Sequence, residues 1–334
     1  MTETLLEVRE LTKAFPVSTG FRKKSYLSAV DGVSFSIDAG TTMGIVGESG
    51  CGKSTLARLI LGLVEADSGE ICMEQQVVDW RSRAGRKQLR RNMQMVFQNP
   101  YSSLNPRSSI GEIIGFPMRA HGASRTEIAE RTAMLLEQVG LHANHASYYP
   151  HQLSGGQRQR VNIARALALN PRLVICDEAV AALDKSVQAQ VLNLLQDLQV
   201  AHGLTYLFIS HDLNVVEYMS DRVSVMYLGH VVETADADEL YQRPLHPYSQ
   251  ALLAASPRLD PDQRVDDTLV DGELPSPLNP PSGCRFRTRC PFAMEVCSAV
   301  RPPLHEVDSG HQVACHLFAG DTSAPQPTPM EVLV

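Results

Sequence analysis

A glycine-rich octapeptide near the start of the chain, from Gly47 to Ser54, has the pattern Gly-x4-Gly-Lys-Ser. Glycines let backbone N–H groups turn inward around phosphate oxygens, and a helix that follows adds its positive end. Lys53 is then expected to reach the β- and γ-phosphates of a nucleotide, and the Ser54 hydroxyl to ligate Mg²⁺. A plain glycine-rich turn is the alternative, and a strand before the loop with a helix after it separates the two. The residues predicted to bind nucleotide here are Gly47, Glu48, Ser49, Gly50, Cys51, Gly52, Lys53, Ser54 and Thr55.

An apolar run, Leu173 to Cys176, ends in two adjacent carboxylates, Asp177 and Glu178. Asp177 is expected to hold Mg²⁺ through its hydration shell, and Glu178 to polarise the attacking water as a general base. Such a run is common by itself. It indicates phosphate chemistry here because a phosphate loop precedes it in the same chain.

The pentapeptide Leu153-Ser-Gly-Gly-Gln157 arises by chance in a chain of this length at roughly one in ten thousand, from average amino-acid usage. It resembles the signature motif of ABC ATPases. The resemblance implies that Ser154, Gly155, Gly156 and Gln157 form a second anion site, which touches the γ-phosphate held by the phosphate loop of a partner subunit. The chain has one phosphate loop and one signature, so we expect it to pair with a second ABC ATPase.

Other residues match this family in order along the chain. The resemblance implies that Gln98 senses Mg²⁺ and the attacking water, that Asp184 belongs to a loop contacting the opposite subunit, and that His211 contacts the γ-phosphate. Phe15 is placed to stack on adenine, with Tyr26 as the alternative. Glu178, His211 and Gln98 are therefore the expected catalytic set.

The chain departs from the family at two positions, with Ala179 in place of the usual proline and Ala181 in place of serine. Neither change removes a charge or a ligand. We expect hydrolysis by Glu178 to survive both.

Three longer strings, 97–107, 246–253 and 272–281, are similar to those of ATPases from dipeptide and oligopeptide importers, and the second ATPase of a dipeptide system is the nearest fit. The resemblance implies a different, homologous ATPase partner, two transmembrane permease subunits and an extracytoplasmic solute-binding protein. Importers of nickel, glutathione and similar solutes share most of these strings and remain an alternative. A soluble ABC ATPase acting on nucleic acid or ribosomes is a further one, although such proteins usually carry two cassettes, coiled coils or basic patches.

Four cysteines crowd into the C-terminal part with the spacing Cys284-x5-Cys290-x6-Cys297-x17-Cys315. In a reducing compartment such a cluster indicates metal ligation before disulfides, and an extended segment would place neighbouring arginines where they favour thiolates. The importers that the chain resembles carry a [4Fe–4S] cluster in this segment. Structural zinc, no metal at all, and a redox or iron sensor that gates the ATPase stay open. The nearby histidines are expected to face solvent; they are His305, His311 and His316.

Positioning these residues requires an α/β fold. We expect the P-loop NTPase fold of an ABC cassette: a RecA-like core with an antiparallel β-subdomain, a helical subdomain and a small C-terminal cysteine-rich segment. Alternation of polar and apolar residues predicts antiparallel strands over 1–40, and helical character is expected over about 88–165. Buried strands are predicted at 42–46, 173–176 and 206–209, and helices at about 53–63, 157–169 and 187–200.

The predicted division is an ABC ATPase domain over 1–255 with its helical subdomain at about 99–165, an extension over 256–318, and a disordered tail over 319–334. A formal charge of −7 and a pI near 5.9 give no basic footprint for nucleic acid. The sequence has no apolar run of the roughly 18 residues that cross a bilayer and no signal-peptide pattern at its start. We therefore expect a peripheral protein, held at the cytoplasmic face of the inner membrane by the permease subunits.

Overall fold

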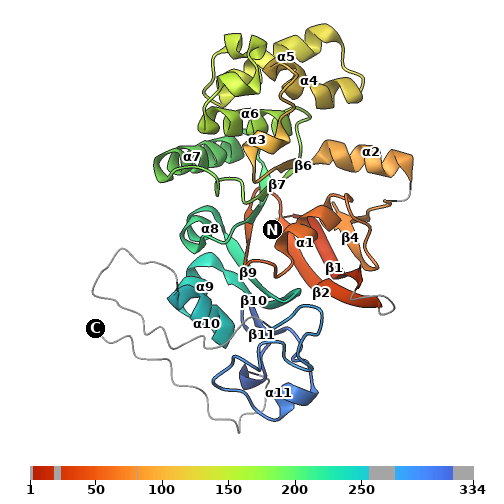
Figure 1. The fold of residues 1–334 in the computed structure, drawn as a ribbon, viewed down its shortest axis with the longest axis vertical. Coiled ribbons are helices and arrows are strands. Elements are labelled where there is room, and N and C mark those ends of the chain that lie inside the picture. Colours follow the sequence, from red (N-terminus) through yellow and green to blue (C-terminus); the bar gives the residue numbers. More distant parts are fainter. Residues whose placement is uncertain (1–2, 19–23, 81, 256–274, 319–334) are drawn as a thin grey trace.

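The computed structural model describes residues 3–18, 24–80, 82–255 and 275–318. Two sheets form its centre, a layer of helices covers one end, and a small C-terminal extension lies at the other (Figure 1). The predicted tail, 319–334, lies outside the described residues, as does 256–274.

The smaller sheet is antiparallel, with the strand order β2-β1-β4-β5. Buried Val33, Phe35 and Ile37 alternate with more exposed serines, which is the period-two pattern of a strand with one face on the core. The antiparallel strands predicted for 1–40 are confirmed, whereas β4 and β5 were not predicted. The strands of the smaller sheet are β1 (Thr4–Ser18), β2 (Lys24–Asp38), β4 (Ser68–Met73) and β5 (Gln76–Val77).

The larger sheet has the strand order β11-β12-β10-β9-β3-β8-β7-β6. Its central strands run parallel, and several are buried along their whole length, as strands covered on both faces are. The carboxyl ends of β3 and β7 carry the phosphate loop and the carboxylate pair, so the sheet brings these motifs to one edge. The parallel strands are β3 (Thr42–Val46), β6 (Met93–Val96), β7 (Leu173–Asp177), β8 (Thr205–Ile209) and β9 (Arg222–Tyr227), and β10 (His230–Asp236) follows β9 in the chain.

The prediction of helical character from about residue 88 was wrong at β6. Helix α2 (Arg83–Asn92) has two arginines in its last turn, and the chain then forms a strand that pairs with β7. Three of the four residues of β6 are buried. The sheet therefore gains an edge strand just before Gln98.

The helical layer contains five α-helical or 3₁₀ elements before the signature helix. Ser124 and Glu127 form the predicted capping box at the start of α5, because each side chain bonds the backbone N–H of the other. Buried Leu135 and Leu136 face α4 and α6 from α5. The elements are α3 (Pro100–Ser103), α4 (Ile110–Ala120), α5 (Arg125–Gln138), η1 (Ala143–Ser147), η2 (Pro150–Gln152) and α6 (Gly155–Leu167).

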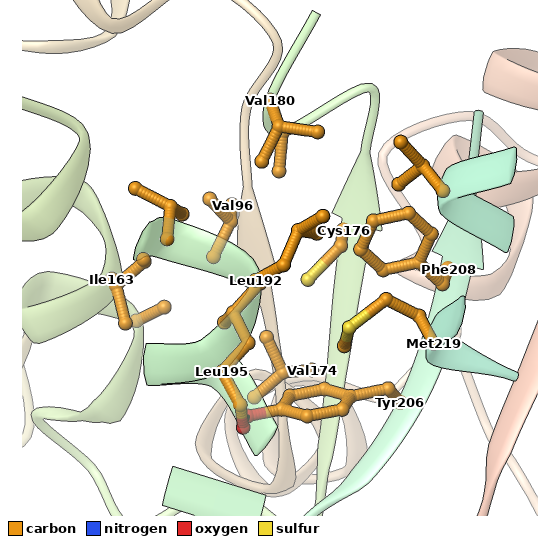
Figure 2. Close-up of a cluster of buried hydrophobic side chains, with 14 of the residues drawn as sticks. Val96, Ile163, Val174, Cys176, Val180, Leu192, Leu195, Tyr206, Phe208 and Met219 are labelled. Atoms are coloured by element: carbon orange, nitrogen blue, oxygen red, sulfur yellow. The ribbon is translucent and has the colours of Figure 1, made fainter. Parts of the chain in front are cut away.

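Helices flank the parallel strands and close the core. Figure 2 shows Val174, Cys176, Tyr206 and Phe208 of the sheet packed with Leu192 and Leu195, and the Tyr206 hydroxyl donates to the Leu195 carbonyl at 2.8 Å. In the described ranges, no helix is long and apolar enough to cross a membrane. The flanking helices are α1 (Lys53–Ile60), α7 (Lys185–His202), α8 (Leu213–Met219), α9 (Ala237–Gln242) and α10 (Pro247–Ala254).

The C-terminal extension joins the larger sheet through β12 (His311–Val313), which pairs antiparallel with β10. Its other elements are α11 (Val296–Ala299), β11 (His305–Asp308) and η4 (His316–Phe318).

The prediction that His311 faces solvent was wrong. Its side chain is 2% exposed, and Nε2 lies 2.7 Å from the Glu233 carboxylate, which is fully buried. Glu233 also accepts hydrogen bonds from the backbone N–H groups of Leu245 and His246. A buried carboxylate needs such partners, so His311 helps to fix the extension to the cassette. His305 and His316 are half-buried and contact backbone carbonyls.

Candidate nucleotide-binding and catalytic site

The phosphate loop lies between β3 and α1, the strand-loop-helix context that its pattern requires. Gly52 adopts a left-handed backbone with φ 111°, and a Cβ there would lie 2.1 Å from the Ala29 carbonyl oxygen, so no larger residue fits. The Lys53 ammonium donates to the carbonyls of Gly47 and Glu48 at 2.7 and 3.0 Å. The lysine thus lies folded over the loop, 5% exposed.

Ser54 and Asp177 meet beside this loop. The Ser54 hydroxyl donates to Asp177 Oδ1 at 3.0 Å, and the Asp177 side chain is 6% exposed. Burial raises the pKa of Asp177, although the Ser54 hydrogen bond opposes the shift. A hydroxyl and a buried carboxylate side by side are hard oxygen donors of the kind that Mg²⁺ prefers, and a bound cation would favour the ionised carboxylate.

Glu178 contacts both of the other residues predicted to be catalytic. The Gln98 side-chain amide donates to Glu178 Oε2, and His211 Nδ1 lies 3.3 Å from Glu178 Oε1. The glutamate backbone is left-handed, with φ 48°, and is held by a hydrogen bond from its N–H to the Ile209 carbonyl at 2.8 Å. Non-glycine residues with this backbone are uncommon and cluster at functional sites. The side chain is 18% exposed, so solvent reaches the carboxylate.

The signature residues form the N-terminus of α6. Ser154 and Gln157 make a reciprocal capping box at 3.3 and 3.0 Å. A Cβ on Gly156 would lie 2.6 Å from Val187 Cγ1, so glycine permits α6 to pack closely on α7. Figure 1 places α6 in the helical layer and α1 against the sheet. The signature therefore presents its exposed Ser154 on a different part of the molecule from its own phosphate loop.

The signature helix is tied to the catalytic loop. Gln159 on α6 is fully buried and donates to the Ala179 carbonyl at 2.6 Å. Asp184 begins α7 and accepts hydrogen bonds from the Val187 N–H and the Ser186 hydroxyl; the Val187 bond is the main cause of a lowered pKa of Asp184. A movement of the signature helix α6 would therefore be transmitted to the loop that follows Glu178, and the reverse.

The two aromatic candidates for adenine lie on the antiparallel sheet. Phe15 on β1 is paired with Leu27 on β2, and the Lys13 ammonium is 5.6 Å from the centre of its ring. Tyr26 is 61% exposed. The Lys13 ammonium is also paired with the Asp67 carboxylate at 2.7 Å, so Phe15 lies beside a neutralised cation, while Tyr26 faces solvent.

The four C-terminal cysteines gather in the extension as free thiols. Burial is the main cause that raises the pKa of Cys315 to about 12, and the other three thiols add to it within that value. The pKa of Cys290 is raised to about 11 and that of Cys284 is also raised, both chiefly by burial. No set of three histidine, cysteine, aspartate or glutamate side chains in the described residues is arranged to hold a metal ion.

The expected extended segment was wrong, and of the neighbouring arginines Arg287 lowers the pKa of Cys284, by less than burial raises it. Residues 285–289 form turns and not an extended segment. Arg285 pairs with Asp31, Arg287 donates to the Ser282 carbonyl, and Arg289 pairs with Glu48. Because these cations are engaged with oxygen acceptors, burial dominates the shifts of Cys284, Cys290 and Cys315.

An exposed groove between α2, β6 and α4 was not predicted. It encloses about 790 Å³, and large apolar side chains of Leu63, Phe97 and Phe116 line it at 54%, 39% and 66% exposure. Its basic lining is Arg83, Arg86, Lys87, Arg90 and Arg165. Phe97 lies next to Gln98, so the groove adjoins the catalytic site; the exposed aromatic in the string after Val96 is the signal that could have revealed it.

Comparison with known proteins agrees with this geometry. The family model described as ABC transporter matches residues 30–181, and the model described as oligopeptide/dipeptide transporter, C-terminal region, matches residues 232–297. The oligopeptide transport ATP-binding protein AppF of Bacillus subtilis is 50% identical over 323 residues, which cover 95% of this chain and 98% of AppF. The di/tripeptide transport ATP-binding protein DppF of Pseudomonas aeruginosa is 49% identical over 316 residues, covering 94% of this chain and 98% of DppF.

Solved structures show the same cassette. CbiO1 of Clostridium perfringens, part of the ABC transporter complex cbiONQ, is 30% identical with a TM-score of 0.63 and covers 72% of this chain and 92% of CbiO1. The ATP-binding cassette MJ0796, a dimer bound to ADP and phosphate, is 30% identical with a TM-score of 0.62 and covers 70% of this chain and 99% of MJ0796. Sequence motifs, site geometry and these likenesses agree: the chain belongs to the ATP-binding proteins of the oligopeptide and dipeptide ABC transporter family.

Proposed function

We propose that this chain hydrolyses ATP to power the import of dipeptides and oligopeptides, as one half of an ATPase pair in an ABC transporter. The observation that carries the proposal is the convergence of Gln98 and His211 on the Glu178 carboxylate, at the sheet edge that also holds the Ser54–Asp177 pair. The groups expected to activate water, to contact phosphate and to hold Mg²⁺ therefore lie in one site.

In the proposed reaction, Lys53 binds the β- and γ-phosphates of ATP. Glu178 takes a proton from a water whose oxygen attacks the γ-phosphorus, and the bond from that phosphorus to the bridging oxygen breaks to release ADP. Ser54, Gln98 and Asp177 would hold Mg²⁺, which neutralises charge on the phosphates when it is bound. His211 orients Glu178 and contacts the γ-phosphate.

A second ATPase subunit would complete the site. Ser154 and the N–H groups of Gly155 and Gly156 stand at the positive end of a 13-residue helix, where an anion is favoured, and Gln157 fixes their geometry. We infer that this end closes on the γ-phosphate of a partner, and that Asp184 contacts the same partner. A homologous but different ATPase chain is the proposed partner.

The transmembrane partners would be two permease subunits, supplied by an extracytoplasmic solute-binding protein. We infer that a cytoplasmic helix of a permease lies in the groove lined by Phe97 and Phe116, since exposed apolar side chains line this groove and Phe97 is adjacent to Gln98. The chain would then sit at the cytoplasmic face of the inner membrane, as an ATPase domain over 1–255 with an extension over 256–318.

Peptide transport is tested by reconstituting the complete transporter in vesicles. The ATPase rate should rise when binding protein loaded with a dipeptide is added on the extracytoplasmic side, and labelled dipeptide should accumulate only with ATP. Nickel and glutathione should neither stimulate the ATPase nor accumulate.

The same assay separates the alternatives. Stimulation by nickel or glutathione in place of peptide would reassign the solute and leave the ATPase intact. An ATPase rate that does not respond to the permeases or to any loaded binding protein would contradict the transport function and favour a soluble ABC ATPase.

We further propose that Cys284, Cys290, Cys297 and Cys315 hold a [4Fe–4S] cluster. Their thiols interact with one another, and the set is Cys₄, as such clusters require. Four thiolates also suit a structural zinc ion, and the metal content of the purified protein decides between the two. The thiols must lose their protons to bind either.

The cluster is tested by replacing Cys290 with serine and comparing this variant with Cys72→Ser, a buried cysteine of the antiparallel sheet. Protein purified without oxygen should hold about four iron atoms per chain, as a [4Fe–4S] cluster on four cysteines requires, together with acid-labile sulfide, and Cys290→Ser should lose both. Cys72→Ser should keep them. Zinc bound in stoichiometric amount in place of iron, or neither metal, would overturn the assignment. ATPase rates with the cluster intact, oxidised and removed then distinguish a structural role from a redox switch.

A further inference from the structure

Arg289 of the C-terminal extension forms an ion pair with Glu48 of the phosphate loop. Both guanidinium Nη atoms donate, at 3.0 Å to Oε2 and 3.1 Å to Oε1. The arginine side chain is 7% exposed and the glutamate side chain 27%. A bidentate, charge-assisted pair in a partly buried position is among the stronger polar contacts in proteins. It joins residues 241 positions apart.

An aromatic cluster holds the arginine in place. Phe286 packs edge-on against Tyr227, with ring centres 5.4 Å apart, and also contacts Tyr248. The Arg289 guanidinium lies 5.9 Å from the Phe286 ring and 6.0 Å from the Tyr227 ring. The side chain is therefore ordered by packing as well as by the ion pair.

The same cluster contacts the backbone of Glu48. Its N–H donates to the Tyr248 hydroxyl at 2.9 Å, and its carbonyl accepts from the Lys53 ammonium at 3.0 Å. Glu48 is thus fixed through its side chain by Arg289, through its N–H by Tyr248 and through its carbonyl by Lys53. The residue that follows the first glycine of the loop has partners for every polar group.

Arg285 makes a second connection between the extension and the loop. It donates to the Leu228 carbonyl and to the Asp31 carboxylate, and the N–H of Gly229, the next residue, donates to the Cys51 carbonyl at 2.8 Å. The extension therefore contacts the phosphate loop directly near its start and indirectly near its end.

We propose that Arg289 is a positioning residue for ATP, which neutralises Glu48 and holds the phosphate loop in its binding shape. Glu48 places a carboxylate two residues before Gly50, in the loop that must accept a triphosphate. With Arg289 attached, this charge is compensated. Without Arg289, the carboxylate is left free beside the phosphate site, where like charges repel. The C-terminal extension thereby sets the ATP affinity of the cassette.

A double-mutant cycle in the assembled transporter tests this assignment. Arg289→Ala should raise the KM for ATP about tenfold, a like-charge effect at a partly screened site, while kcat falls less than about threefold because the catalytic carboxylate is untouched. Glu48→Gln removes the carboxylate charge and keeps the shape of the side chain, and its own KM for ATP is the reference for the double variant. The double variant should return to the KM of Glu48→Gln alone, because no free charge remains.

The cycle has a matched control in Arg287→Ala. Arg287 lies in the same turns, but it is half-buried and donates to the Ser282 carbonyl within the extension. Its loss should leave the KM for ATP unchanged. All four C-terminal cysteines stay in place in these variants, and equal iron content in the parent and in Arg289→Ala shows that a changed KM does not come from loss of the metal.

Two results would overturn the role of Arg289. One is a KM for ATP within twofold of the parent in Arg289→Ala. The other is a double variant as weak as Arg289→Ala, since loss of the loop's shape alone predicts no recovery when the charge is removed. Should Arg289→Ala unfold at a lower temperature than the parent, Arg289→Lys decides: it keeps the charge without the fork, so a KM raised tenfold in this variant as well would exclude charge compensation.

Discussion

Replacing Glu178 with glutamine is expected to stop ATP turnover while ATP stays bound. The amide keeps the shape of the side chain and its contact with Gln98, but it cannot take a proton from the attacking water. General base catalysis contributes about 10²–10⁴-fold to such reactions, so phosphate release should fall at least a hundredfold. Equilibrium binding of ATP should stay close to that of the parent, as measured by retention of labelled nucleotide after gel filtration.

The same variant should lock the ATPase pair in its closed form. Because the partner's signature contacts the γ-phosphate, the closed pair lasts as long as that phosphate remains on ATP, and the trapped particle should elute as a stable dimer only when ATP is present. Glu217→Gln is the matched control: this exposed glutamate lies on α8, the helix after His211, and its loss should change neither rate nor particle size. Turnover by Glu178→Gln above a tenth of the parent rate would remove Glu178 from the role of base.

Motifs confined to a few consecutive residues could be predicted from the sequence. Thr42–Val46 is mostly apolar and is followed at once by the glycine-rich loop that starts at Gly47, so both the strand and the loop were predictable, and the structure has them at those positions. The capping box at Ser124 could also be predicted, because its two members are three residues apart. Such motifs can be predicted because all of their interacting residues lie within a few positions of one another in the sequence.

Strand β6 shows where local patterns fail. Met93–Val96 follows a helix with two arginines in its last turn, and four residues are too few for either period to stand out. Pairing with β7 decides the outcome, and that pairing brings together segments about eighty residues apart in the chain.

The electrostatics of the extension could not be predicted for the same reason. Arg285 and Arg289 look like partners for neighbouring thiolates in the sequence, but the fold supplies the carboxylates of Asp31 and Glu48 instead. His311 likewise meets Glu233, which is 78 positions away. Burial is then the largest cause of the raised pKa values of Cys284, Cys290 and Cys315. Ion pairs form between groups that are close in space, and only the tertiary fold shows which carboxylates lie near these arginines and this histidine.

Replacing Lys53 with alanine is expected to abolish nucleotide binding at this chain's own phosphate loop. The ammonium is the only cation of the loop residues 47–55, and it bridges the Gly47 and Glu48 carbonyls from a buried position. The substitution removes both the charge that faces the β- and γ-phosphates and two bonds that shape the loop. A charge-assisted contact to phosphate contributes about 2–5 kcal/mol when one partner is truncated, so the Kd for ATP should rise at least thirtyfold in a titration with a fluorescent nucleotide.

The matched control for Lys53→Ala is Arg58→Ala, which removes an exposed cation from the last turn of the same helix. Arg58→Ala should bind ATP as the parent does. Lys53→Met separates the two effects of the alanine substitution, because it fills the buried space without the charge: weak binding in both variants assigns the loss to the ammonium, whereas binding restored by methionine assigns it to packing under the loop. Tight binding of ATP by Lys53→Ala would mean that the glycine-rich turn is not a phosphate loop, and the composite site built from it and the partner's signature would have no ligand to close on.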